Sequence, residues 1–528
     1  MKTIARFLVA LAALWPVSCA RREAPPAFSE TLYRHLEGDP PTLDPTTTNE
    51  EIGLRVEQML FRPLIGIDRE RRYVPALAAS WTASPDGLAF DFRLDPAARW
   101  EDGTPVTSQD VAFTIDRVRD PKVPALNWRW GFEDVVAVET PEATRAVVRF
   151  REPYAQRLLA FNLPIVSRAA FARTPGSADR QPFASGPYRL ESWEANQKLT
   201  LVRRADQPAE AYPFERIVFR VIPDGAVRFR AGTRGELDEF RISRDQRGQA
   251  ERSAEFAARN RILKAPQFSV VIVVWSCRNP ILADVRVRRA LARAWPRAET
   301  ARRLYVPEGA ALISGPYPAG AHENAPDVAP PPFDPAESAR LLDEAGLPMG
   351  RDGIRRQRGR RASIEFVYPP GERIYTNIGE ILREAYGKAG IELVLRPLDW
   401  AAFAQRFTAG EFDVIPTANT FLPPNLDPYP FYHSSMAPPK GQNSGFYASA
   451  EADRAMEAAR RELDDGRRLE LYRQIHRLLA ADPPADFLWS AEQYWGLSKR
   501  LEGVESSPLG LFHFLPGPLG WRPAARRG

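Results

Sequence analysis

The sequence predicts a mixed α/β fold, and three features support this class. Short β-branched or alternating runs and amphipathic stretches with helical spacing follow one another along the chain. No segment repeats with a period of about 20 to 50 residues, which argues against a solenoid or a propeller. Of the 528 residues, 44% are hydrophobic and 26% are charged, which is typical of a globular protein large enough for several cores.

The first clear strand is followed closely by a capped helix. Residues 88–94 alternate between apolar and polar side chains, the period of a half-buried strand. Thr107 and Asp110 then have the spacing of a capping box, and apolar residues follow at helical spacing. We expect a helix that begins after Thr107 and ends before Pro121.

Strands and helices continue to alternate through the rest of the chain. Further strands are expected at residues 198–202, 217–222, 270–275 and 391–395. Helices are expected after Asp284, from Asp334 to Gly346, over 374–387, and over most of 448–481 with a break at Asp464-Asp465-Gly466.

Composition excludes several classes of function. The 72 basic and 67 acidic residues leave a net charge of only +5, too little for a nucleic-acid-binding surface. With two cysteines and five scattered histidines, and no HExxH or CxxC, we expect no metal site and no cofactor. Cys277 follows an apolar run and is interpreted as a small buried hydrophobe. Nucleotide-binding and nucleophile-elbow motifs are absent, although a Ser-His-Asp triad from distant positions stays open.

The N-terminus has the pattern of an export signal. Lys2 and Arg6 precede an apolar stretch at 7–15, which is too short to span a bilayer. We therefore expect the mature protein outside the cytoplasm, in the periplasm or at the outer face of the cytoplasmic membrane.

Two forms of processing are compatible with the residues that follow. Cys19 after the small Ser18 resembles a bacterial lipobox, in which the cysteine is lipidated after cleavage. Cleavage after Ala20 is the alternative. Residues 1–20 are assigned to the signal peptide region with its lipoprotein-like end, and 21–30 to a short tether.

Several motifs occur in a fixed order between about residues 30 and 510. They are GDPPTLDP at 38–45, PALAASW at 75–81, WEDGTPVTSQDV at 100–111, SGPY at 185–188, GELD at 235–238, VRVRRAL at 285–291, the capped segment 334–346, GEFD at 410–413 and DP at 427–428. This order resembles the family 5 extracellular solute-binding proteins of ABC importers, the oligopeptide, dipeptide and nickel-binding type.

The resemblance implies a type II periplasmic-binding-protein-like architecture, with two hinged lobes and a satellite domain. Carried onto this chain, lobe I comprises residues 31–57, 185–268 and 499–528, the satellite domain 58–184, and lobe II 269–498. Ligand would be held in the cleft between the lobes and would shift the open–closed equilibrium by contacting both of them.

The resemblance also suggests where a ligand would bind. Trp400 matches a cleft tryptophan of the peptide-binding members. Those members hold a peptide α-amino group with an aspartate after the GEFD element, but here 419–426 contains no acid. Neutral hydrogen bonds and an apolar wall would come instead from Asn419, Thr420, Phe421 and Asn425.

Two tryptophans of the satellite domain deserve a separate interpretation. Trp128 and Trp130 could reach the cleft, but a Trp-Arg-Trp sequence is more often a surface or core patch.

The predicted function is capture of a peptide or related small solute and its delivery to ABC permease subunits served by a separate ATPase. We expect a monomer with no catalytic residues, no nucleic-acid partner and a possible N-terminal lipid anchor at Cys19. An exported hydrolase on the same scaffold and a solute-sensing lipoprotein are the alternatives. The identity of the ligand stays open.

Overall fold

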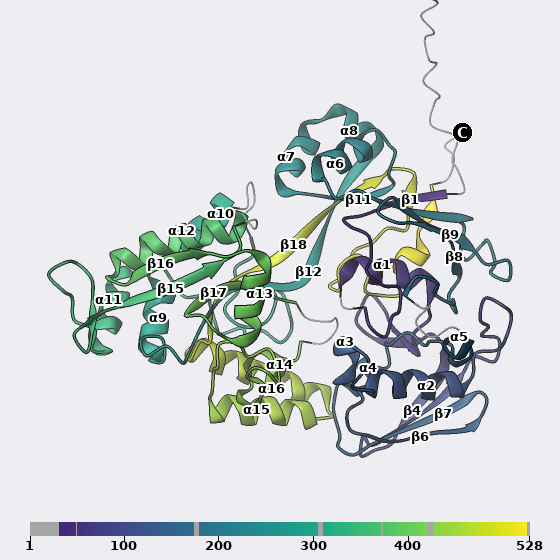
Figure 1. The fold of residues 1–528 in the computed structure, drawn as a ribbon, viewed down its shortest axis with the longest axis horizontal. Helices are drawn as coiled ribbons and strands as arrows, with labels where there is room; N and C mark the ends of the chain where they lie inside the picture. The colour runs from purple at the N-terminus through teal and green to yellow at the C-terminus, as the bar shows by residue number, and fades with distance from the viewer. Residues whose placement is uncertain are drawn as a thin grey trace, which may run out of the picture.

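The computed structural model describes residues 31–48, 50–173, 179–304, 310–370, 373–420 and 426–524. The predicted mixed α/β class is confirmed. A ten-stranded mixed sheet forms the centre of the molecule (Figure 1). Its order is β16 (Glu392–Pro397), β15 (Ser363–Tyr368), β17 (Val414–Thr420), β12 (Asn260–Trp275), β18 (Ala485–Ser498), β11 (Glu239–Ile242), β1 (Thr31–Leu36), β10 (Arg216–Val221), β9 (Lys198–Arg203) and β8 (Tyr188–Glu194).

Strands β12 and β18 connect the two halves of this sheet. They are 16 and 14 residues long, pair antiparallel, and run from one half to the other (Figure 1). The sequence predicted only 270–275 as a strand, because the earlier residues of β12 lack an apolar run. Their strand conformation comes from pairing with β18 instead. The register shifts between Pro266 and Val270 and again between Val271 and Ile272, which marks an irregularity between the halves.

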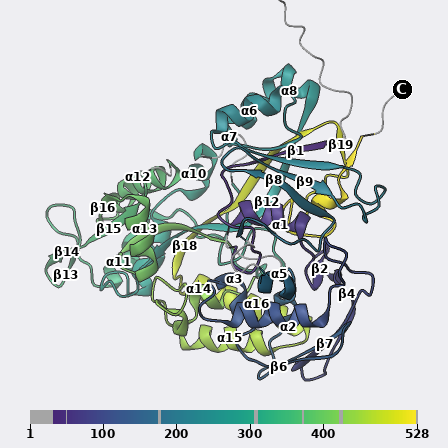
Figure 2. The same cartoon turned by 45° about the vertical axis from the view of Figure 1, so that its right-hand side comes forward.

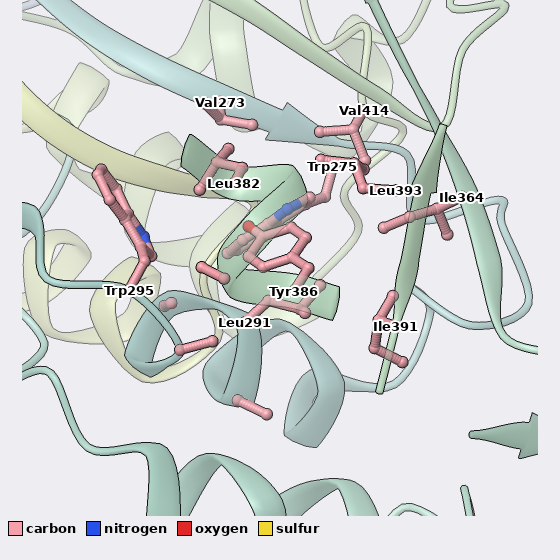
Figure 3. Close-up of a cluster of buried hydrophobic side chains, with 14 of the residues drawn as sticks. Val273, Trp275, Leu291, Trp295, Ile364, Leu382, Tyr386, Ile391, Leu393 and Val414 are labelled. Carbon is pink, nitrogen blue, oxygen red and sulfur yellow. The ribbon is translucent and has the colours of Figure 1, made fainter. Parts of the chain in front are cut away.

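Helices that the sequence predicted pack against the half of the sheet that contains β15, β16 and β17. α9 (Val285–Arg293) begins at Asp284, which accepts a hydrogen bond from the Arg286 amide at 2.8 Å. α11 (Pro335–Glu344) begins at Asp334, which accepts from the Glu337 amide at 2.9 Å. With α12 (Arg373–Lys388) they cover an apolar core (Figure 3). That core includes Val273, Trp275, Leu291, Trp295, Ile364, Leu382, Tyr386, Ile391, Leu393 and Val414.

A second, antiparallel sheet lies beside the other half. Its order is β4 (Ala78–Ala83), β5 (Ala89–Leu94), β7 (Arg145–Phe150) and β6 (Val135–Glu142). α2 (Ser108–Arg119) packs on it and begins as predicted: the Asp110 carboxylate accepts from the Thr107 amide at 2.9 Å. We call these four strands and α2 the satellite sheet.

A pair of helices reaches from the β15–β17 half toward the satellite sheet. α15 (Ala450–Arg461) and α16 (Asp465–Ala481) lie close to α3 (Leu126–Arg129) in Figures 1 and 2, and Gln156, just before α4 (Arg157–Ala160), donates to the Tyr472 hydroxyl of α16 at 2.6 Å. The break between them ends at Asp464, whose side chain caps α16 by accepting from the Arg467 amide at 2.8 Å. The predicted break was therefore slightly late, because Asp465 and Gly466 already belong to the helix.

The remaining elements complete the layers around these sheets. They are α1 (Glu51–Leu60), β2 (Ile65–Ile67), β3 (Tyr73–Pro75), α5 (Arg168–Arg173), α6 (Gly225–Thr233), α7 (Arg244–Arg252), α8 (Ala254–Arg259), α10 (Arg297–Leu304), β13 (Arg356–Gln357), β14 (Arg360–Arg361), α13 (Trp400–Ala409), α14 (Tyr429–Tyr432), β19 (Leu501–Glu502) and β20 (Arg522–Pro523). Among the described residues, no helix has the length and apolar character needed to cross a membrane.

Candidate ligand-binding site

A cavity of about 760 Å³ lies between α1, the helices beside the satellite sheet and the C-terminal segment 512–522. This volume is in the usual range for a site that encloses a small organic ligand. Its walls include Leu54, Glu57, Gln58, Phe61, Trp128, Trp130, Leu159, Asn162, His513 and Phe514. Most of these side chains are apolar or aromatic, with a few polar groups among them, which is the composition of a small-molecule site.

Two tryptophans in the cavity wall are held in place by contacts outside it. The indole nitrogen of Trp128 donates to the carbonyl oxygen of Pro45 at 2.9 Å. The ring of Trp130 meets the ring of Tyr154 edge to face, with centres 5.9 Å apart. Both rings therefore present fixed aromatic surface to the cavity, and both also pack against a buried apolar cluster, as a core patch would.

Helix α1 contributes the acidic side of the cavity. Glu57 is only 1% exposed, and it accepts a hydrogen bond from the Thr48 hydroxyl. Burial raises its pKa to about 8. Arg55 on the same helix also lines the cavity, but its charge is balanced by Glu37 at 3.0 Å and Glu239 at 3.1 Å.

The cavity adjoins the other half of the molecule. Leu159 and Phe514 from its wall belong to one apolar cluster with Leu426 and Tyr432, which come from the segment after β17. Next to this cluster, the Tyr154 hydroxyl donates to the Asp427 carboxylate at 3.3 Å. The described residues that line the cavity all belong to one half, and this apolar cluster joins that half to the other.

Asp427 is the first acid after β17 among the described residues, and it is already paired. It is 3% exposed, and its Oδ2 lies 2.9 Å from Nε of Arg460 in an ion pair. The backbone amide of Tyr429 donates to its other oxygen at 3.0 Å. These partners give Asp427 a structural role.

The residues that the sequence predicted to bind ligand lie on α13 and at the end of β17. Trp400 begins α13 and is 63% exposed, with its ring 5.6 Å from that of Phe403. Asn419 is buried, and its amide donates to the Tyr432 hydroxyl at 3.0 Å. Thr420 ends β17, opposite Ser269.

Of that set, Trp400 and Asn419 do not line the cavity. Phe421, Asn425 and the lipidation residue Cys19 lie outside the described residues. Their predicted roles stay predictions.

Sequence analysis missed the contribution of α1 and of the C-terminal segment. One signal in α1 was available: Glu57 shares a helical face with Gly53, Val56 and Leu60, so an acid stands within an otherwise apolar stripe. For residues 512–516 the sequence offers no such signal. They reach the cavity wall only because the chain after β18 folds back beside α1.

Comparison with known proteins identifies the class of protein. The model for bacterial extracellular solute-binding proteins, family 5 Middle, matches residues 72–443. The chain belongs to this family. It is therefore an exported solute-binding component of an ABC importer, and the predicted resemblance and function class are confirmed.

Individual relatives of this family 5 solute-binding protein span nearly its whole length. Protein XP55 of Streptomyces lividans is 27% identical over 483 residues, covering 90% of this chain and 86% of the relative. The oligopeptide-binding protein AppA of Bacillus subtilis is 24% identical and covers 89% of this chain and 88% of its own. The structure of NikZ from Campylobacter jejuni, in complex with Ni(L-His), superimposes with a TM-score of 0.80 at 20% identity, covering 94% and 100% of the two chains. That last likeness confirms the type II binding-protein fold.

Proposed function

We propose that this protein captures a peptide or a related small organic solute in the cavity beside α1 and delivers it to a membrane permease. The observation that carries the proposal is the aromatic-walled space of about 760 Å³ next to the contact between the two halves. The names of relatives such as the oligopeptide-binding protein AppA and the dipeptide-binding protein of Escherichia coli support a peptide as the solute.

Capture is proposed to close the molecule about β12 and β18. The register shifts between Pro266 and Ile272 interrupt regular pairing there, so bending at this place disturbs few ladder hydrogen bonds. In this proposal lobe II is residues 269–498, and lobe I with its satellite domain 58–184 forms the remainder of the mature chain. Solute that touches both lobes favours the closed form by its differential affinity.

The opposing wall in the closed form is proposed to come from lobe II. Trp400 offers an exposed indole, and the chain from Asn419 through Thr420, Phe421 and Asn425 would supply polar and apolar contacts. Because Asn419 already donates to Tyr432, its remaining contribution would be through the carbonyl oxygen of its amide.

The solute is proposed to leave chemically unchanged. A serine nucleophile needs a histidine nitrogen that is free to take its proton. Ser314 lies 3.1 Å from Nε2 of His476, but the Ala325 amide donates to Nδ1 at 2.8 Å, so Nε2 carries the proton and cannot act as that base. Ser435 contacts Nδ1 of His433 at 2.7 Å, where the amide of Ser435 also donates to that nitrogen as a local cap. The geometry at His476 supports a binding protein over a hydrolase.

Anchoring and assembly are also part of the proposal. Lipidation of Cys19 would hold the mature protein at the outer face of the cytoplasmic membrane, close to its permease. We propose that it acts there as a monomer, with hydrolysis of ATP left to a separate subunit.

Thermal stabilisation by solute, combined with recovery of that solute, tests the binding function. Solute at about 100 times its Kd should stabilise the protein by about 2.7 kcal/mol, and its mass should be unchanged after prolonged incubation. Conversion to product in proportion to protein concentration would contradict the proposal and favour the hydrolase.

A further inference from the structure

One acid in the cavity wall has no cation. Glu57 on α1 is 1% exposed, and its Oε1 accepts from the Thr48 hydroxyl. Its Oε2 has no hydrogen-bond partner among the described residues. Buried polar atoms are normally paired, because desolvation without compensation is costly. A partner supplied by ligand would satisfy this oxygen.

Two arginines that share the wall with Glu57 are paired with other acids. Arg55 pairs with Glu239 at 3.1 Å, and Arg62 lies 3.6 Å from Asp95. Among the described residues, no arginine or lysine forms an ion pair with Glu57. Within the described part of the chain, no side chain supplies the positive charge that would balance a carboxylate at this position.

The pKa of Glu57 reflects its burial and its acidic neighbours. Burial raises its pKa to about 8. The hydrogen bond from Thr48 opposes this effect, while Asp44 and Glu50 add to it by repulsion. Because its pKa lies above 7, the side chain is mainly a neutral acid at pH 7. An arriving cation would favour the carboxylate, and the proton would pass to solvent.

The surfaces around Glu57 suit the rest of an organic cation. Trp128 and Trp130 supply aromatic faces to the same cavity, where a nearby cation is attracted by the ring electrons. The acid after β17, Asp427, is neutralised by Arg460 and is not available for a second cation. Glu57 therefore replaces Asp427 as the acid that can pair with a cation of the ligand.

We propose that Glu57 binds the ammonium group of the solute, so that the ligand class is a primary amine with an apolar body, such as a peptide with a free N-terminus. This inference rests on the proposed function. Arg99 and Arg522, which also line the cavity, pair with no carboxylate among the described residues and donate to backbone carbonyls. They suit an anionic group elsewhere on the same ligand.

The test uses two matched mixtures of synthetic tri- to pentapeptides, one with free N-termini and the other N-acetylated. Full-length protein, freed of co-purified solute, is mixed with each and the retained peptides are counted by native mass spectrometry. Wild type should retain free peptides about 30-fold or more in preference to acetylated ones, the loss typical of an unpaired buried charge. Glu57→Gln keeps the shape and should lose that preference, whereas Glu51→Gln makes the same substitution on α1 outside the cavity wall and should keep it.

The outcomes separate this inference from the proposed function. Equal retention of both mixtures by wild type, or an unchanged preference in Glu57→Gln, overturns the role of Glu57 while binding itself stands. If wild type retains neither mixture, peptide binding fails and the inference fails with it. Should Glu57→Gln not fold, the preference of wild type between the two mixtures still decides.

Discussion

The ion pair of Asp427 and Arg460 allows a direct test of whether Asp427 stabilises the fold. Asp427 is 3% exposed, and the guanidinium of Arg460 lies 2.9 Å from it and 4.0 Å from the ring centre of Tyr429. Arg460→Met removes the cation and keeps much of the apolar stem. The variant leaves a buried carboxylate that keeps the Tyr429 amide and the Tyr154 hydroxyl among its partners.

The expected loss follows from the burial of the pair. Removing one member of a buried ion pair typically costs about 3–5 kcal/mol, because the other charge stays desolvated. The unfolding entropy of a chain of this length is about 1 kcal/mol per degree, so Tm should fall by about 3–5 °C if the chain unfolds as one unit. Arg460→Met with Asp427→Asn removes both charges and should recover most of that loss.

Differential scanning calorimetry of the two single variants and the double variant gives the coupling between the two side chains. The matched control is Arg461→Met on the same helix, whose pair with Glu457 is exposed and 3.8 Å long. This control should change stability by less than about 1 kcal/mol. If Arg460→Met costs no more than Arg461→Met, or if the double variant shows the sum of the single losses, the pair is not the stabilising contact described above.

Three further predictions concern single side chains. Burial lowers the pKa of His476 to about 4, below its ordinary value of about 6.5, so folding favours the neutral ring. The free energy of unfolding should be full above about pH 6.5 and about 3 kcal/mol lower near pH 4. His476→Gln should reduce this loss of stability in acid, measured as melting curves over a series of pH values. An equal acid loss in that variant would contradict the assignment. Burial raises the pKa of the Cys277 thiol, so a thiol reagent at pH 8 should label native protein about tenfold more slowly than protein in urea, and equal rates would count against a packed thiol. Trp400→Ala should weaken binding of the co-purified solute with Tm within about 1 °C of wild type, since the ring is 63% exposed, and an unchanged Kd measured by calorimetry would remove Trp400 from the site.

The elements that could be predicted from the sequence are those with local signals. Asp284 and Asp334 each cap a helix through a bond two or three residues away, so their patterns are visible without the fold. The first half of β12 has no such signal, because its conformation depends on pairing with β18, more than 200 residues later. Propensity alone cannot supply that information.

In the candidate site, even fewer features have a local signal in the sequence, and more depend on tertiary contacts. The sequence indicated that no acid precedes Asp427 after β17, and the structure shows why Asp427 does not replace it: Arg460, on a later helix, already neutralises it. The isolation of Glu57 could not be predicted, because it depends on which cations fold next to α1 and how they are paired. Trp128 was considered for the cleft, but only its three-dimensional neighbours place it in the cavity wall.

Mass spectrometry of the solute that co-purifies with the exported protein tests the central claim most directly. We predict that wild type carries an intact small molecule, released on denaturation with the mass it had before binding, and that Trp128→Ala, which removes an indole from the cavity wall, carries much less of it. Equal amounts in both proteins, or recovery of cleavage products alone, would contradict a binding protein that holds its solute in this cavity.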